Sequence, residues 1–194
     1  MKQRELPEGY EIREMTGEEF GPLWEKYAKA LFDDAQLMYR PIDSYSAEEK
    51  GKIPALRSHL QQAFRIRLGL FFRGDFVGWT WGFQETPETF YMCNSGVLEP
   101  HRRKGLYTIL MQRIVSRAVG EGFQRIYSRH TATNNAILIA KLKAGFFITS
   151  FELSDTFGVL VHLCYLPNPT RRKVLDFRAG HLRPDDEVKK LFGI

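Results

Sequence analysis

The chain has 194 residues, of which 43% are hydrophobic and 26% charged, and its formal net charge is +5. These values suit one globular domain, with or without a short extension, and argue against a disordered chain. No apolar run approaches the roughly 18 residues of a membrane-spanning helix, and the N-terminal stretch has no signal-peptide core, so we expect no membrane partner. Because Cys93 and Cys164 are too few for a disulfide framework, we expect reduced thiols and a cytoplasmic protein.

The N-terminal third predicts one strand followed by helices. Residues 10–15 are expected to form a short strand. Thr16 and Glu19 make the capping-box pattern, in which each side chain bonds the other's backbone, at the start of a helix that extends to about Phe32. The polar stretch after it contains proline and glycine and predicts a loop with one short helix. A further helix is expected over residues 54–64.

The apolar pattern then changes to the alternation that is typical of strands. Strand character on both sides of residues 73–75 predicts a hairpin, and a further strand is expected over 89–97. Trp79, Trp81 and Phe83 alternate along the hairpin, so they should share one face of the sheet. Two interpretations stay open for this aromatic row: packing in the core, or contact with an apolar or cationic ligand.

The second half of the chain alternates helices and strands. We expect a helix that ends near residue 121, a strand over 125–130, a helix over 134–144 and a strand pair over 146–153 and 158–165. Antiparallel strands, then a β-α-β-α unit, then a hairpin predict an α/β or α+β domain around one twisted sheet.

The last part of the chain is basic. Residues 171–194 carry seven basic and four acidic side chains, which accounts for more than half of the net positive charge. The stretch TRRKVLDFR is compatible with nucleic-acid binding, but the acidic residues 185–187 and the lack of a known nucleic-acid motif argue against it. We expect residues 167–194 to form a helical extension that packs on the domain or at a subunit interface.

A basic turn precedes the helix of the second half. Arg102, Arg103 and Lys104 stand directly before Gly105, and the apolar helical pattern begins at once. Cations at a helix N-terminus oppose the helix dipole, whereas an anion bound there is favoured by the dipole and by the free N–H groups. A glycine lets the backbone approach such a ligand closely. The turn is therefore either fully solvated or a phosphate-binding site.

Two segments together resemble the GNAT family of N-acetyltransferases. The first is the strand end Leu98-Glu99-Pro100 followed by the loop RRKGLY, which is similar to the family's cofactor loop. The second is Asn134, a short helix, and then Gly145-Phe146. The resemblance covers about residues 10–165. It implies an α/β (α+β) fold with a mixed, mostly antiparallel twisted sheet of about seven strands, flanked by helices and splayed into a V between strands 4 and 5.

The resemblance also implies a cofactor and an activity. Residues 1–166 would form an acetyltransferase domain that binds acetyl-CoA between strands 4 and 5 and transfers the acetyl group to a primary amine by direct attack in a ternary complex. Main-chain groups near the end of strand 4 would bind the pantetheine arm, and the helix start would hold the pyrophosphate. The cofactor-binding residues so implied are Val97, Leu98, Arg102, Arg103, Lys104, Gly105, Leu106, Tyr107, Thr108 and Asn134. No metal site is implied.

The chain departs from the family pattern at the catalytic positions. Tyr91 stands where several relatives carry a glutamate base, Lys141 where a tyrosine general acid is common, and Tyr107 where glycine or alanine is usual. The catalytic residues therefore stay open. Candidates for the base are Glu85, Glu88, Tyr91 and His130, and Lys141 is either a proton donor or a solvated residue.

Alternation predicts that two polar residues share the face of Tyr91. They are Cys93 and Ser95, and either could line the gap between the strands. Nothing beside Cys93 indicates a lowered pKa, so an acyl-cysteine route is not expected.

The acceptor side is less defined by the sequence. The resemblance places residues 37–41 near the acceptor, with the aromatic row as a neighbour, and the acceptor is a small-molecule or peptide amine. A homodimer is compatible with the chain, and nucleic acid is not the expected partner. The alternative interpretation is a catalytically inactive GNAT-fold module with a regulatory or nucleic-acid-binding role.

Overall fold

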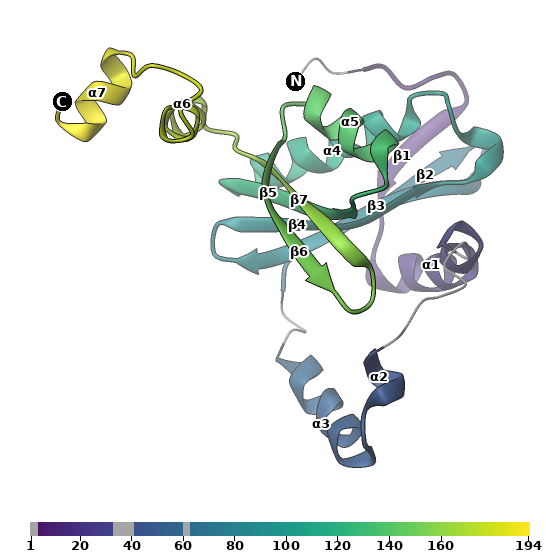
Figure 1. Ribbon diagram of the computed structural model, residues 1–194. Coiled ribbons are helices and arrows are strands. Elements are labelled where there is room, and N and C mark those ends of the chain that lie inside the picture. The colour runs from purple at the N-terminus through teal and green to yellow at the C-terminus, as the bar shows by residue number, and fades with distance from the viewer. Residues whose placement is uncertain (1–3, 33–40, 60–62) are drawn as a thin grey trace.

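The computed structural model describes residues 4–32, 41–59 and 63–194. Within these residues the chain forms one seven-stranded sheet with the order β1-β2-β3-β4-β5-β7-β6 (Figure 1). Every neighbouring pair is antiparallel except β4 and β5, which are parallel. The expected mixed, mostly antiparallel sheet is therefore confirmed. The strands are β1 Tyr10–Glu14, β2 Arg65–Phe72, β3 Asp75–Thr86, β4 Thr89–Val97, β5 Arg125–Thr131, β6 Phe147–Ser154 and β7 Gly158–Tyr165.

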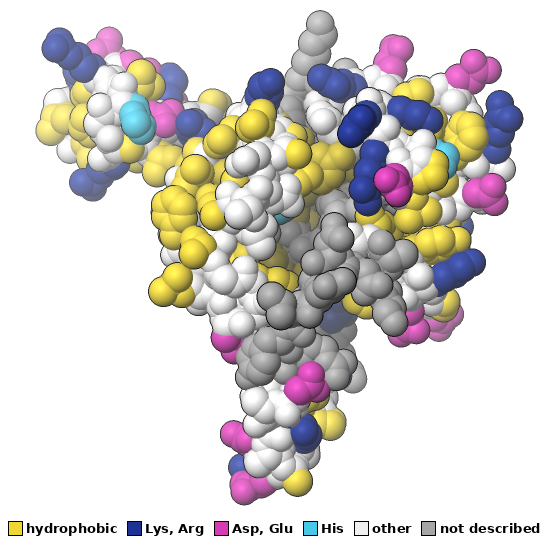
Figure 2. Space-filling view, turned by 45° about the vertical axis from the view of Figure 1, so that its right-hand side comes forward, with side chains coloured by type: hydrophobic (Ala, Val, Ile, Leu, Met, Phe, Trp, Pro, Cys, Tyr) yellow, Lys and Arg dark blue, Asp and Glu magenta, His cyan; other side chains and the backbone are white. Residues whose placement is uncertain are grey.

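Helices cover both faces of this sheet, whereas α2 and α3 lie away from it (Figure 1). The last two helices project from the domain (Figures 1 and 2). The helices α4 and α5 pack on one face, and α1 packs on the other. None of the helices in the described parts of the chain is long and apolar enough to cross a bilayer. The helices are α1 Gly17–Phe32, α2 Pro41–Ser44, α3 Ala47–Ser58, α4 Leu106–Gly120, α5 Asn135–Lys143, α6 Pro169–Arg178 and α7 Asp186–Phe192, with a 3₁₀ turn at Glu99–His101.

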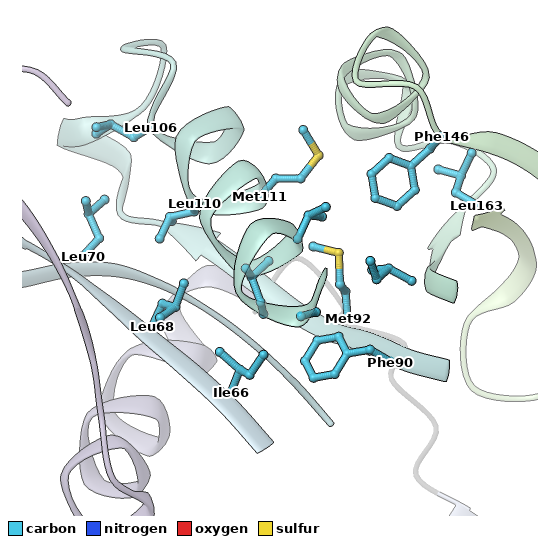
Figure 3. Packing of buried hydrophobic residues seen from close by; sticks show 14 of the residues in the cluster. Ile66, Leu68, Leu70, Phe90, Met92, Leu106, Leu110, Met111, Phe146 and Leu163 are labelled. Carbon is cyan, nitrogen blue, oxygen red and sulfur yellow. The ribbon is translucent and has the colours of Figure 1, made fainter. Parts of the chain in front are cut away.

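The main core lies between the sheet and α4 (Figure 3). Alternate residues of β2, among them Ile66 and Leu70, point toward α4, and Leu110 and Met111 of α4 fill the space above them. Each of these four side chains is at most 1% exposed. Burial of an aliphatic side chain of this size contributes about 1.5–3 kcal/mol. The core thus holds α4 firmly, and with it the helix N-terminus that follows the basic turn.

The opposite face carries α1 and the aromatic row. The capping box expected at the start of α1 is present, since the Thr16 N–H donates to Glu19 (2.8 Å) and the Glu19 N–H donates to Thr16 Oγ1 (3.2 Å). Trp79 is fully buried under this helix, and Trp81 packs against the same cluster. Phe83 contacts Trp81, with ring centroids 6.1 Å apart. The prediction that the three aromatic residues share one face is confirmed.

The helix expected over 54–64 was placed wrongly. The structure has α3 over Ala47–Ser58, with a second capping box between Ser46 and Glu49. Pro54 lies inside this helix rather than at its start. Residues 60–62, and residues 37–40 of the segment expected near the acceptor, lie outside the described residues.

The C-terminal helices form a small unit attached to the edge of the domain. The guanidinium of Arg172 lies 4.6 Å from the ring centroid of Phe147 and donates to the carbonyl of Gly145 (3.2 Å). Phe177 of α6 packs against Phe192 of α7, with ring centroids 5.5 Å apart. Residues 167–194 therefore contact the domain mainly through the start of α6.

A β-bulge in β4 shapes the middle of the sheet. Trp81 of β3 pairs with Asn94, whereas the next residue, Gly82, pairs with Met92, so Cys93 is the extra residue. Ser95 consequently lies on the face opposite to Tyr91, where its hydroxyl bonds that of Thr80 (2.8 Å). The prediction that Ser95 shares the face of Tyr91 is wrong, because the bulge shifts the alternation by one residue.

The bulge depends on the absence of a side chain at Gly82. A Cβ at this position would lie 2.3 Å from the carbonyl oxygen of Tyr91, which is too short for any contact. We expect Gly82→Ala to lower the free energy of unfolding by about 2 kcal/mol or more, because backbone must move to accept the methyl group.

Gly51→Ala is the matched control in urea unfolding of both variants. Gly51 lies inside α3 with no described atom within 4 Å of its missing Cβ, so alanine should raise the stability by about 0.5–1 kcal/mol. Equal stability of the two variants would contradict this account of the bulge.

Candidate active site

The site begins where β4 and β5 separate. The two strands pair over only three residue pairs, Thr89 with Arg125, Phe90 with Ile126 and Tyr91 with Tyr127. Beyond these pairs β4 follows β3, and β5 follows β7. The expected splay between strands 4 and 5 is therefore present. The strand edges that face each other across it have no shared ladder, so their main-chain groups are available to a ligand.

The N-terminus of α4 lies at the end of β4. Gly105 caps the helix with φ +76°, a left-handed conformation, and no side chain caps the first amides. The first N–H groups of an α-helix have no partner within the helix. Arg103 also has a positive φ, of +63°, so the turn bends sharply before the helix. This geometry presents main-chain donors beside three cations, which fits a polyphosphate group.

A cavity of about 330 Å³ opens between this turn and α5. Four of the residues expected at the cofactor do not line this cavity: Leu98, Lys104, Thr108 and Asn134. The amide of Leu98 donates to the carbonyl of Val77 (2.9 Å), and the side chain of Asn134 caps α5 by accepting from the Ile137 N–H (3.4 Å). The cavity is lined by Val97, His101, Arg102, Arg103, Gly105, Leu106, Tyr107, Ala136 and Ile137.

Two lining residues have altered environments. Burial raises the pKa of Tyr107, so this tyrosine stays neutral. Arg102 donates from Nε to the carbonyl of Val97 (3.0 Å), which ties the basic turn to the end of β4. The cation is thereby held at the rim of the cavity, and its remaining donors have no hydrogen-bond partner among residues 4–32, 41–59 and 63–194 and can meet an anion.

Lys141 lies at the apex of the splay. Its side chain is buried, with 1% of the residue exposed, although it is a lysine. Nζ donates to Ser128 Oγ (2.7 Å) and lies 3.5 Å from Met92 Sδ. Ser128 and Met92 are the first residues beyond the last β4–β5 pair. Nζ therefore spans the two strands at the point where they part.

The surroundings of Lys141 are unusual for an ammonium group. Nζ lies 4.6 Å from the ring centroid of Phe146, and none of the described carboxylates pairs with it. Burial lowers the pKa of Lys141 from its usual 10.5 to about 7. At neutral pH the group can therefore either hold or release a proton.

His130 shares this face of β5. Its Nε2 lies 3.0 Å from Ser128 Oγ, so one hydroxyl contacts both His130 and Lys141. Burial, and then the charge of Lys141, lower the pKa of His130 to about 3, so the imidazole is neutral at pH 7. Both contacts are hydrogen bonds when Lys141 Nζ donates to Ser128 Oγ and the Ser128 hydroxyl donates to His130 Nε2. The proton of the neutral imidazole is then on Nδ1.

The opposite face of the splay carries a tyrosine pair. Tyr91 and Tyr127 have ring centroids 4.9 Å apart, and the hydroxyl of Tyr127 donates to the carboxylate of Glu85. Burial raises the pKa of both tyrosines, and the adjoining Glu85 raises that of Tyr127 further. Both tyrosines are therefore neutral at physiological pH, and the Glu85 carboxylate is hydrogen-bonded to the hydroxyl of Tyr127.

An arginine lies over this pair. The guanidinium of Arg129 is 4.8 Å from the ring centroid of Tyr91 and donates to Glu152 (3.3 Å), which also accepts from His162 (2.6 Å). The hydrogen bonds from His162 and Arg129 lower the pKa of Glu152. No group of three or more His, Cys, Asp or Glu side chains in the described residues is arranged to hold a metal ion.

Sequence reasoning missed Tyr127 and Arg129. The signal was available in the stretch RIYSRHT, where these two residues alternate with Ile126 and Ser128 and so must face the other side of the sheet. Glu88, a candidate base, lies at the end of the β3–β4 hairpin and pairs with Arg171 of α6 (3.3 Å). Burial raises the pKa of Cys93 to about 11, so its thiol is protonated at neutral pH.

The buried lysine predicts an unusual pH dependence of stability. Between pH 7 and 10.5 the unfolded chain holds the Lys141 proton and the folded chain does not, so stability rises with pH in this window. Below pH 7 both states are protonated and the full cost of burial remains. We therefore expect Lys141→Met to stabilise the fold most at pH 6, with a gain that shrinks by up to about 1.4 kcal/mol per pH unit above pH 7.

Urea unfolding at pH 6, 7, 8 and 9 measures this difference. Lys143→Met, which removes an exposed lysine from the same helix, is the control and should show no such trend. A gain that does not change with pH would show that Lys141 keeps an ordinary pKa.

Comparison with known proteins agrees with this architecture. A family model described as the acetyltransferase (GNAT) family matches residues 10–146. The yncA protein from Salmonella typhimurium, solved with its cofactor acetyl-CoA, is 16% identical, with 91% of this chain and 98% of that chain covered and a TM-score of 0.59. A comparison with curated protein sequences found no match.

Two further solved structures have the same fold. A GNAT family acetyltransferase from Elizabethkingia anophelis with acetyl-CoA bound is 13% identical, with 82% of this chain and 99% of that chain covered and a TM-score of 0.55. The ribosomal-protein-S18-alanine N-acetyltransferase from Escherichia coli is 12% identical, with 81% and 93% covered and a TM-score of 0.58. Since the family model spans more than half of the chain, this protein belongs to the GNAT family of acetyltransferases.

Proposed function

We propose that this protein is an acetyl-CoA-dependent N-acetyltransferase that acts on a primary amine by direct attack in a ternary complex. The observation that carries the proposal is the cavity at the start of α4, which adjoins the end of β4 where the ladder to β5 is missing. An uncapped helix N-terminus with cations suits a pyrophosphate, and an unpaired strand edge suits an amide-containing arm. The acetyl-CoA bound to related structures supports the same assignment.

The residues present fit this cofactor. The amides of the first turn of α4, with Arg102 and Arg103, would hold the pyrophosphate, and main-chain groups of β4 up to Val97 would bond the pantetheine arm. When bound, acetyl-CoA supplies a thioester that an amine can attack and a thiolate that leaves. Residues 1–166 would carry this activity, and residues 167–194 would be an extension attached through α6.

Lys141 is the proton donor in this proposal. Nζ sits at the apex of the splay, on the face covered by α4 and α5, and carries a proton at neutral pH in part of the molecules. A cation with a pKa near 7 can protonate a departing thiolate, whose parent thiol has a pKa of about 8.5 in cysteine. Its positive charge also stabilises the thiolate before the proton moves.

The base acts from the other face. An amine must lose a proton to react, and the Tyr127 hydroxyl can accept that proton as it passes its own to the Glu85 carboxylate. The raised pKa of Tyr91 makes this residue a poor base by itself. His130 is less suited, because its imidazole has a pKa of about 3 and faces Lys141.

No observation favours the inactive nucleic-acid-binding alternative. Three of the four cations of α6 pair with carboxylates: Arg171 with Glu88, Arg172 with Asp176, and Lys173 with Asp185 and Glu187. Figure 2 shows basic and acidic side chains intermixed on the projecting C-terminal unit. The face of this unit seen in Figure 2 is therefore mixed in charge rather than a continuous basic patch.

Calorimetric titration with acetyl-CoA tests the cofactor site. We expect saturable binding, and Gly105→Val should weaken it at least tenfold, because valine is strained at φ +76° and covers the helix start. Gly122→Val is the matched control, since Gly122 at the other end of α4 has φ +98° and the same strain without a ligand.

Two outcomes would overturn the assignment. One is that the wild-type protein binds ATP as tightly as it binds acetyl-CoA. The other is that the Gly105→Val and Gly122→Val variants bind acetyl-CoA with equal affinity.

Steady-state kinetics with an accepted amine tests the two proton-transfer roles. We expect Glu85→Gln and Lys141→Met each to lower kcat by about 100-fold or more, without change in the Kd of acetyl-CoA. The wild-type rate should fall above about pH 7 as Lys141 loses its proton, and Lys141→Met should lack this fall.

Glu88→Gln and Lys143→Met are the controls for these variants, because they make the same changes outside the splay. Full kcat in Glu85→Gln would remove Glu85 from the mechanism.

A further inference from the structure

The segment before β1 lies along α4 and reaches the N-terminus of that helix. The backbone N–H of Arg4 donates to Gln112 Oε1 in the second turn of α4 (3.1 Å). Leu6 packs against the main core cluster, and the carbonyl of Pro7 accepts from the Tyr10 N–H (3.2 Å). The segment is thus anchored at Arg4 and Leu6 and turns into β1 after Pro7, and the side chain of Arg4 is held near the start of α4.

Arg4 lies directly against the helix cap. A Cβ built on Gly105 would be 3.2 Å from Arg4 Nη1, so the guanidinium occupies the space beside this glycine. Arg4 therefore joins Arg102, Arg103 and Lys104 at one helix N-terminus. In the described parts of the chain none of these four cations pairs with a carboxylate.

Tyr10, the first residue of β1, fixes the turn from the same side. Its hydroxyl accepts from Lys104 Nζ (3.1 Å) and lies 2.8 Å from Nδ1 of His101. The rings of Tyr10 and His101 meet edge to face, with centroids 5.7 Å apart. One side chain of β1 therefore holds both the residue before the basic turn and the last cation in it.

Four cations at the positive end of a helix dipole repel one another and the helix. An anion placed among them is attracted by each cation and by the helix end, and these attractions offset the repulsion. Arg102 and Arg103 line the cavity beside Gly105, and Arg4 and Lys104 lie outside its lining at the same helix start. Because the helix start presents uncapped amides, the anion that fits is a compact group with several oxygens.

We infer that the N-terminal segment is part of the cofactor site: Arg4 binds the pyrophosphate of acetyl-CoA, and Tyr10 positions Lys104 for the same group. This inference rests on the proposed function. Arg4 is assigned to the pyrophosphate rather than to the 3′-phosphate because it lies against Gly105, the residue at the start of the free amides.

Calorimetry with three acetyl donors tests the assignment. Arg4→Ala should weaken the binding of acetyl-CoA and of acetyl-dephospho-CoA about tenfold each, and leave that of S-acetylpantetheine, which has no phosphate, unchanged. Tyr10→Phe keeps the ring. It should weaken the binding of acetyl-CoA and acetyl-dephospho-CoA several-fold and leave that of S-acetylpantetheine unchanged. Arg57→Ala removes one exposed charge from α3 and should change none of the three affinities.

The results that overturn the inference are distinct from those that overturn the proposed function. Unchanged affinities in Arg4→Ala, a loss for acetyl-CoA alone, or an equal loss for S-acetylpantetheine would each refute the pyrophosphate contact. Titration with inorganic pyrophosphate is an independent measurement, since Arg4→Ala should weaken its binding too. If the wild-type protein bound pyrophosphate through Arg4 but not acetyl-CoA, the proposed function would fail and the anion contact would stand.

Discussion

The short ladder between β4 and β5 is the constraint on which the rest of the site depends. β5 pairs with β7 over six residues on its other edge, and β4 follows β3 through the bulge at Cys93, so the two halves of the sheet turn away from each other after Tyr91 and Tyr127. Main-chain groups in the interior of a sheet are normally paired, and leaving them unpaired costs free energy. A ligand with amide groups can remove that cost, which makes the splay a binding site as well as a structural feature.

Lys141 is costly for the fold in the position it occupies. A buried ammonium group without a carboxylate partner is destabilising, and an apolar residue of similar length would fill the same space at lower cost. Such groups are concentrated at functional sites, where a shifted pKa serves a reaction. The family resemblance implies a tyrosine acid here. A lysine differs from it in being cationic while it holds the proton, so it can stabilise an adjacent thiolate before the proton is transferred.

The sequence predicts the positions of the strands and of most helices better than the catalytic groups, for physical reasons. Hydrophobic periodicity and the capping box at Thr16 depend on local geometry, so a single segment of sequence is enough to predict them. The capping box at Ser46 could have predicted the start of α3 in the same way. The bulge at Cys93 arises from pairing across strands and has no local signature. The helix α5 is apolar almost all round, and Ile139 and Leu142 are 51% and 43% exposed while Lys141 is 1% exposed. Its pattern therefore does not show which face is buried.

The charges on the two faces of the sheet differ in a way that fits two substrates of opposite sign. On the side of α4 and α5 the groups near the splay are cations, Lys141 at its apex and the basic turn at its open end. On the side of α1 the carboxylates of Glu85 and Glu152 adjoin neutral aromatic rings, with Arg129 between them. Under the proposed function, an anionic cofactor would be attracted to the first face and a protonated amine to the second. The two reactants would then meet at the gap between β4 and β5, each with the proton-transfer group it needs on its own side.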